Sequence, residues 1–75
     1  MQTTFGNKIR MLRETKEINQ TELGTMLNMR QRKISYIECD KYEPSISDII
    51  AFSLFFNVSA NYLLGLPKGM KYPER

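Results

Sequence analysis

A chain of 75 residues is long enough for one small domain and too short to bury a second core. With one cysteine and no histidine, it can form neither an internal disulfide nor a zinc site of the usual Cys/His spacing. The net charge of +3 and the pI near 9.2 are only mildly basic, so composition alone does not establish a nucleic-acid partner.

Apolar residues at helical spacing predict a first amphipathic helix from Thr4 to about Lys16. Its apolar stripe consists of Phe5, Ile9 and Leu12. Arg13 lies at the edge of that stripe. Spacing alone leaves open whether Arg13 is a solvated surface residue or a partly buried partner of Glu38.

Two short helices joined by a tight turn are predicted between Asn19 and Glu38. The first runs from Gln20 to Leu27, because Asn19 is a favourable N-cap and Glu22 three residues later completes a capping box. Asn28 tolerates positive φ and can turn the chain. A second helix follows from about Gln31 to Glu38. We expect Gly24 to allow a close approach of this second helix, since glycine otherwise weakens a helix. The inward-facing residues of the two helices are predicted to be Leu23, Leu27, Ile34 and Ile37.

The predicted helix from Gln31 begins with cations where local rules favour anions. Arg30 occupies the capping position, and Arg32 and Lys33 follow in the first turn, against the positive end of the helix dipole. Local inconsistency of this kind is typical of functional sites. An external polyanion such as a DNA backbone would meet both the cations and the free N–H groups of that helix end.

A loop after Glu38 ends at Pro44, and Ser45 with Asp48 repeats the cap arrangement for a helix through Phe56, which Asn57 can stop. One predicted face of this helix consists of Ile46, Ile49, Phe52, Ser53 and Phe56. Three further apolar residues lie outside that face, namely Ile50, Leu54 and Phe55. They fit either a crowded core or a subunit interface, and the sequence leaves both open.

Ser59 is predicted to cap a last short helix from Ala60 to Leu64, which Gly65 ends. The residues of this helix expected to pack inward are Tyr62, Leu63 and Leu64. The domain is expected to span residues 1–66, followed by a basic tail over 67–75 that is too polar to form a core. We expect this tail to be flexible, and the alternative is an arm that orders on a partner subunit.

We expect a cytoplasmic protein with no membrane partner. The N-terminus has no apolar h-region and so no secretory signal. The uncharged stretch from Ile49 to Pro67 is interrupted by polar residues, so two buried helices are expected there and no membrane span. Cys39 is expected to be a semi-buried, reduced residue.

The order of these segments resembles the phage-repressor and Cro type of helix-turn-helix protein, the XRE family of bacterial transcriptional regulators. The resemblance covers Phe5 to Gly65 and rests on FGNKIRMLR, NQTELGTML, ISYIE, EPSISDII and NVSANYLLG. It implies an all-α, five-helix, lambda-repressor-like DNA-binding bundle that lays its third helix in the major groove of double-stranded DNA. Glu17 and Asp40 stand where the family often has glycine, so we expect the chain to differ locally there.

The resemblance also assigns roles to individual residues. The base-reading positions are Gln31, Arg32, Ser35 and Tyr36. The phosphate-binding positions are Gln20, Arg30, Lys41 and Tyr42, and we expect Thr21 and Lys33 to contact phosphates as well. The family also pairs an arginine of its first helix with the glutamate that ends its third, which are Arg13 and Glu38 here.

The main hypothesis is a sequence-specific transcriptional regulator, repressor-like, that acts as a homodimer on an operator with two half-sites. Ile50, Leu54 and Phe55 are the candidates for the dimer contact. The alternative is a protein-interaction module of the same fold, such as an antitoxin-like or polymerase-binding partner. No nucleophile–base arrangement or phosphate-binding glycine loop is evident, so we expect no enzyme activity, no cofactor, no metal and no small-molecule effector domain.

Overall fold

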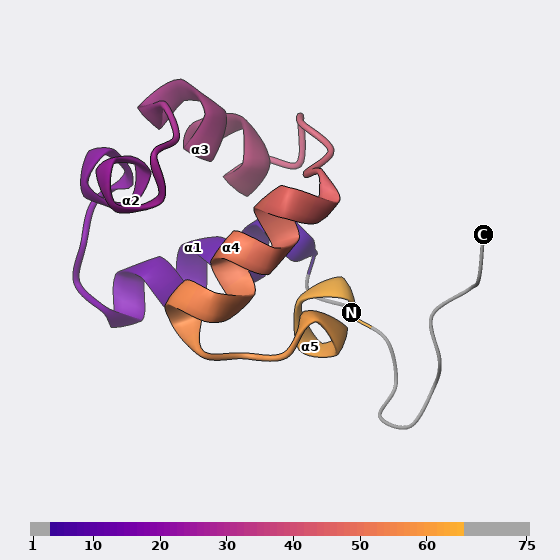
Figure 1. Cartoon of the computed structure of the whole chain (residues 1–75). Helices are drawn as coiled ribbons and strands as arrows, with labels where there is room; N and C mark the ends of the chain where they lie inside the picture. Colours follow the sequence, from indigo (N-terminus) through magenta and orange to yellow (C-terminus); the bar gives the residue numbers. More distant parts are fainter. Residues whose placement is uncertain (1–3, 66–75) are drawn as a thin grey trace.

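The computed structural model describes residues 4–65, which form a bundle of helices (Figure 1). These helices are α1 (Phe5–Thr15), α2 (Gln20–Leu27), α3 (Gln31–Glu38), α4 (Ile46–Phe56) and α5 (Ala60–Leu64). No strand is present within residues 4–65, so the prediction of an all-α, five-helix fold is confirmed. The predicted flexible tail over 67–75 lies outside the described residues.

Apart from α3, the helices begin where side chains accept hydrogen bonds from free backbone N–H groups. Asn19 and Glu22 form a capping box at the start of α2, and Ser45 with Asp48 forms a second one at the start of α4. The Ser59 hydroxyl accepts from the Tyr62 N–H at the start of α5. These predicted caps are confirmed, and they explain why the helix bounds follow from local sequence.

Asparagines end two of the helices in the left-handed region. Asn28 has φ of 58° after α2, and Asn57 has φ of 56° after α4. Glu17 and Asp40 also adopt positive φ, both 59°. The backbone at these two positions therefore has the conformation that glycine favours. The local difference that we expected from the missing glycines does not occur.

Glu17→Gly is expected to stabilise the domain by about 0.5 to 1 kcal/mol, because glycine relieves the strain of a left-handed backbone and only part of that gain is lost to chain entropy. Asp40→Gly is a matched control, since the Asp40 carboxylate accepts a hydrogen bond from the Gly6 N–H at 3.0 Å and that bond would be lost. Urea denaturation followed by circular dichroism measures both changes. A gain for Asp40→Gly equal to that for Glu17→Gly would contradict a capping role for Asp40.

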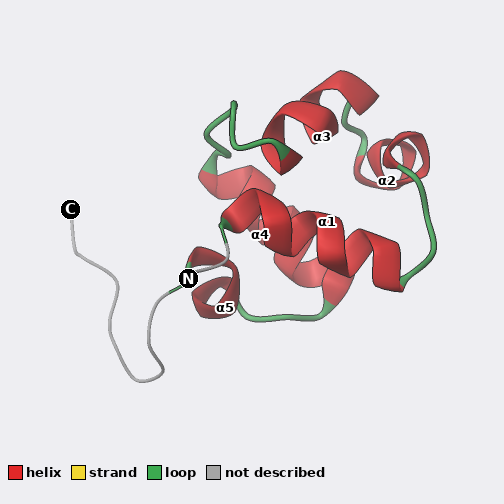
Figure 2. Cartoon of the chain, turned by 180° about the vertical axis from the view of Figure 1, so that it is seen from behind, coloured by secondary structure: helices red, strands yellow, loops and turns green. Residues whose placement is uncertain are grey.

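The core lies where all five helices converge, and its buried side chains are Ile9, Leu23, Ile34, Ile37, Phe52, Phe56 and Leu63. Leu27 packs against this cluster but stays partly exposed. Seen from behind, α2 and α3 lie together on one side of the bundle, and α5 packs against α1 and α4 on the other (Figure 2). In this arrangement α2 and α3 pack directly against each other.

Four residues are more exposed than the sequence predicts. Ile46 is 59 % exposed. The buried residue of the first turn of α4 is Asp48, two positions on, and two residues correspond to about 200° around a helix. In the short α5, Leu63 takes the inward position, so Tyr62 and Leu64 are rotated outward on either side. Cys39 is exposed, because it follows the buried end of α3 and begins the loop.

Candidate nucleic-acid interface

The turn between α2 and α3 brings two backbones unusually close. A Cβ atom at Gly24 would lie 2.5 Å from the carbonyl oxygen of Met29, so no larger residue fits without a shift of the backbone. The Met29 N–H donates to the Gly24 carbonyl at 2.7 Å. The predicted packing reason for Gly24 is therefore confirmed. It fixes the start of α3 against α2.

The first turn of α3 carries unsatisfied N–H groups and positive charge. Arg30 is the N-cap residue, its side chain makes no capping hydrogen bond, and no acidic residue lies in the first turn. The predicted uncapped start of the helix is thus confirmed. Arg30 and Arg32 are both exposed. This helix end is suited to an anion, because the dipole, the free N–H groups and the side chains all favour negative charge.

The predicted base-reading residues occupy two adjacent rows of α3. Arg32 and Tyr36 lie one helical turn apart, and both are exposed. Gln31 and Ser35 form the neighbouring row, in which Gln31 is exposed and Ser35 is half-buried. Three of the four side chains can therefore reach a partner without rearrangement of the bundle.

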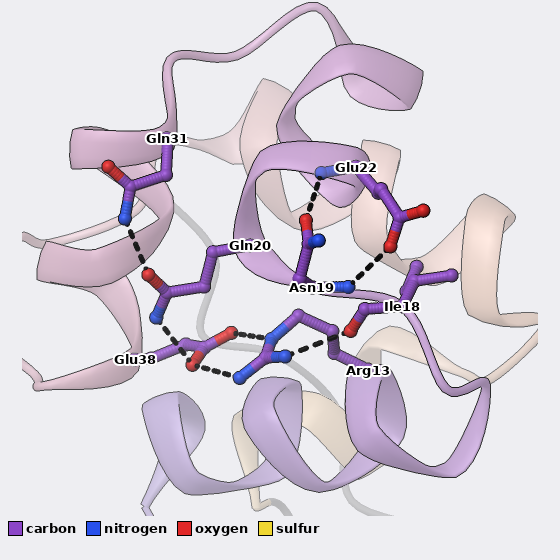
Figure 3. Close-up of polar contacts among 7 residues, drawn as sticks. All are labelled: Arg13, Ile18, Asn19, Gln20, Glu22, Gln31 and Glu38. Carbon is purple, nitrogen blue, oxygen red and sulfur yellow. Dashed lines mark hydrogen bonds and ion pairs between the residues drawn. The ribbon is translucent and has the colours of Figure 1, made fainter.

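Gln31 is joined to the interior by a chain of hydrogen bonds (Figure 3). Its Nε2 donates to Oε1 of Gln20 at 2.7 Å, and Nε2 of Gln20 donates to Oε1 of Glu38 at 3.0 Å. This hydrogen bond uses one N–H of the Gln31 side chain and leaves its Oε1 and its second N–H for a partner. Gln31 is thus held in one orientation by a residue at the start of α2.

Arg13 and Glu38 form the buried ion pair on which that chain ends (Figure 3). Arg13 donates from Nε to Oε2 of Glu38 at 2.6 Å and from Nη2 to Oε1 at 3.1 Å. Its Nη1 donates to the Ile18 carbonyl at 2.9 Å. The hydrogen bond to Glu38 raises the pKa of Arg13 against the effect of burial, so the guanidinium stays charged inside the bundle. The pair ties α1 to the end of α3.

The predicted phosphate-binding residues come from the start of α2, the turn before α3, α3 itself and the loop after it. Thr21, Arg30, Lys41 and Tyr42 are exposed, and Gln20 is half-buried. Lys33 differs from them, because its Nζ lies 2.9 Å from Oδ1 of Asp48 in an ion pair. A phosphate at Lys33 would have to share the ammonium with that carboxylate.

Asp48 is buried, and its negative charge is stabilised by hydrogen bonds from Lys33 and from the Ser45 N–H. Burial raises the pKa of Asp48, but hydrogen bonds from Lys33 and from the Ser45 N–H lower it by more, so the net pKa lies below the ordinary value. Sequence reasoning identified Asp48 as a capping residue and missed its contact with Lys33. The capping pattern is local, whereas this contact joins two helices and has no spacing signal.

An open surface hollow lies beside α3. Its lining residues are Asn28, Met29, Arg30, Arg32, Lys33, Tyr36 and Tyr42. The charged residues of this lining are all cations, and the two tyrosine rings add apolar surface. The hollow brings together base-reading and phosphate-binding candidates from α3, the preceding turn and the following loop.

An apolar stripe runs along the outer face of α4, formed by Ile46, Ile50 and Leu54 at four-residue spacing. Leu54 is 77 % exposed. Phe55, predicted for the same contact, instead packs edge-on against Phe56 at 5.0 Å between ring centroids and is partly buried. The exposed stripe therefore includes Ile46, which was not predicted for this contact. The half-buried Phe55 only borders the stripe.

None of the helices within residues 4–65 has the length and apolar character needed to cross a membrane. Residues 4–65 also contain no cluster of three His, Cys, Asp or Glu side chains that could hold a metal ion.

Comparison with known proteins gives both a family and similar structures. Residues 6–68 match the family described as helix-turn-helix domain. The P22 c2 repressor in complex with synthetic operator 9T is 32 % identical with a TM-score of 0.79, over 84 % of this chain and 96 % of that one. The solution structure of the P22 c2 DNA-binding domain (1–76) is 31 % identical with a TM-score of 0.76, over 84 % of each chain.

A transcriptional regulator from Listeria innocua shares the fold, with a TM-score of 0.80 at 19 % identity over 97 % of this chain and 68 % of that one. No curated protein matches the chain.

Proposed function

The chain belongs to the helix-turn-helix domain family, and from that premise we propose that it is a sequence-specific transcriptional regulator that binds double-stranded DNA through α3. The observation that carries the proposal is the start of α3, which has no side-chain cap, no acid and two exposed arginines. The similar P22 c2 repressor was solved with a synthetic operator, which supports a DNA partner of the same kind.

Phosphate contacts would position the domain without reading sequence. Arg30 and Lys41 are exposed cations on either side of α3, in the turn before it and in the loop after it. The α3 N–H groups and the exposed hydroxyls of Thr21 and Tyr42 add uncharged donors. Such an arrangement suits the sugar-phosphate strands that border a groove.

Base contacts would come from the exposed rows of α3. The guanidinium of Arg32 matches O6 and N7 of guanine, and the amide of Gln31 matches N6 and N7 of adenine, because each presents two hydrogen-bonding atoms in one plane. Tyr36, one turn after Arg32, can pack against a thymine methyl group or donate to a phosphate. The Gln20–Gln31 hydrogen bond supports Gln31 in this role by limiting its rotation.

We propose a homodimer for the bound state, because one short helix reads too few base pairs to select a site in a genome. A two-fold dimer would place two copies of α3 on half-sites about 34 Å apart. The α4 stripe of Ile46, Ile50 and Leu54 supports an isologous contact, since it is apolar and uncharged. The half-buried Phe55 would border it.

Selection of bound duplexes from a random pool tests the proposal and reports the half-site and spacing together. Arg32→Ala is expected to weaken binding to the selected duplex by about 1 to 3 kcal/mol and to relax the preference at one base position. Arg10→Ala, which removes an exposed arginine of α1 outside the predicted interface, is the control and should leave the preference intact.

Unchanged affinity and preference in Arg32→Ala would contradict the assignment of α3 as the reading helix. A protein-interaction module of the same fold would enrich no duplex at any salt concentration.

A further inference from the structure

Lys33 connects two helices across the loop that separates them. Its Nζ lies 2.9 Å from Oδ1 of Asp48, so the first turn of α3 is joined to the first turn of α4. The Asp48 side chain is 7 % exposed and that of Lys33 is 31 % exposed. This contact is therefore largely shielded from water, which strengthens it relative to a surface ion pair.

The Asp48 carboxylate has few ways to replace Lys33. Its Oδ2 accepts from the Ser45 N–H at 3.0 Å, while Oδ1 accepts from Lys33. The backbone hydrogen bond alone does not neutralise a buried negative charge, and water has little access to it. Withdrawal of the ammonium toward a phosphate would leave Asp48 buried without its counter-charge, which is unfavourable.

The same ammonium also contacts the loop between the two helices. It lies 5.4 Å from the centroid of the Tyr42 ring, within the range of a cation–π contact. Lys33 and Tyr42 both line the hollow beside α3. The loop that carries Lys41 and Tyr42 is thus fixed at its middle by Lys33 and at its end by the Ser45–Asp48 cap.

We propose that Lys33 is a positioning residue for DNA binding and does not itself neutralise a phosphate, in place of the phosphate-binding role predicted from its charge. Its charge stays with Asp48, and its function is to hold the loop so that the uncharged Tyr42 meets the DNA backbone at a fixed distance from α3. This inference rests on the proposed DNA binding. Among the interface cations of residues 4–65, Lys33 alone is paired with a carboxylate.

The two roles differ in their dependence on salt. A cation that neutralises a phosphate releases counterions from the DNA. Its removal therefore reduces the steepness of the negative slope of log affinity against log salt concentration by about 0.9. Removal of a residue that positions an uncharged contact such as Tyr42 weakens binding by the same factor at every salt concentration. Lys33→Gln/Asp48→Asn removes both charges, so it avoids an unpaired buried carboxylate and keeps the net charge of the domain.

The test is a titration of a selected duplex by fluorescence anisotropy at several salt concentrations. We expect Lys33→Gln/Asp48→Asn to give a line parallel to that of the wild type, displaced by a factor on the order of ten. Lys41→Gln, which removes an exposed cation of the same loop, should make the slope less steep by about 0.9. Thermal unfolding of each variant establishes that it is folded at the titration temperature.

A second readout separates positioning from a loss of general stability. If Lys33 acts through the loop, Lys33→Gln/Asp48→Asn should weaken binding little further when Tyr42→Ala is already present, because Lys33 and Tyr42 are coupled. A slope that is less steep by about 0.9 in Lys33→Gln/Asp48→Asn, or additive effects of Lys33→Gln/Asp48→Asn and Tyr42→Ala, would overturn the proposal. A wild-type protein that binds no duplex would overturn it together with the proposed function, and that result is distinct from a changed slope.

Discussion

Gly6→Ala is expected to destabilise the domain by about 3 kcal/mol or more, because a side chain at this position enters occupied space. A Cβ atom at Gly6 would lie 2.3 Å from the Ile37 carbonyl oxygen and 2.7 Å from that of Glu38. Both are backbone atoms at the end of α3 and cannot rotate away. The total stability of a domain of 75 residues is about 4 to 11 kcal/mol, so this change removes a large part of it.

Urea denaturation followed by circular dichroism measures this loss as a lower midpoint. Met11→Ala is the control in the same helix, because its side chain is exposed and its removal should change stability by no more than about 0.5 kcal/mol. Equal midpoints for Gly6→Ala and the wild type would mean that α1 and the end of α3 are not in the close contact described.

Glu38→Ala is expected to have the second large effect, a loss of about 3 to 5 kcal/mol, because it leaves a buried arginine without its counter-charge. The Arg13 side chain is 12 % exposed and would keep only the Ile18 carbonyl as acceptor. Gln20 would also lose the acceptor that anchors it, and with it the support of Gln31. Chemical denaturation measures the stability, and titration of a selected duplex measures the effect on binding.

Arg13→Met/Glu38→Leu separates the cost of an unpaired charge from the loss of the pair itself. Replacement of both partners by apolar residues of similar size is often neutral or stabilising, so we expect this double variant to be much more stable than Glu38→Ala. If the double variant were as unstable as Glu38→Ala, the loss of stability would come from disrupted packing around the pair and not from an unpaired buried charge.

The helices and their bounds could be predicted because their signals are local. Asn19, Ser45 and Ser59 cap helices through side chains that bond within three residues, and Asn28 and Asn57 end helices by adopting positive φ. Those interactions depend on neighbours in the sequence. The fold class followed from their order and from the family resemblance.

Burial was predicted less well, because it depends on how each helix is rotated against the others. The apolar residues of α4 fill more than one face, and the hydrophobic pattern gave Ile46 the same status as the fully buried Phe52. The inward position in the first turn of α4 is occupied instead by the polar Asp48, which forms an ion pair with Lys33 of α3. No spacing rule indicates that pair.

In the candidate site, too, the local features could be predicted and the contacts between distant residues could not. The uncapped, cationic start of α3 could be predicted, since a missing cap at Arg30 is visible in the sequence. The hydrogen-bond chain from Gln31 to Glu38 and the cap that Asp40 gives to α1 join residues far apart in the chain. They depend on tertiary packing, so only the structure reveals them.

The most direct test of DNA binding by α3 is the affinity of the wild-type chain for a selected duplex and for a scrambled duplex across a range of salt concentrations. We expect the selected duplex to bind more tightly at every salt concentration, and both affinities to fall as salt rises, with a slope of about −0.9 per phosphate neutralised. Equal affinity for the two duplexes, or affinity that does not change with salt, would contradict DNA recognition through the cationic start of α3.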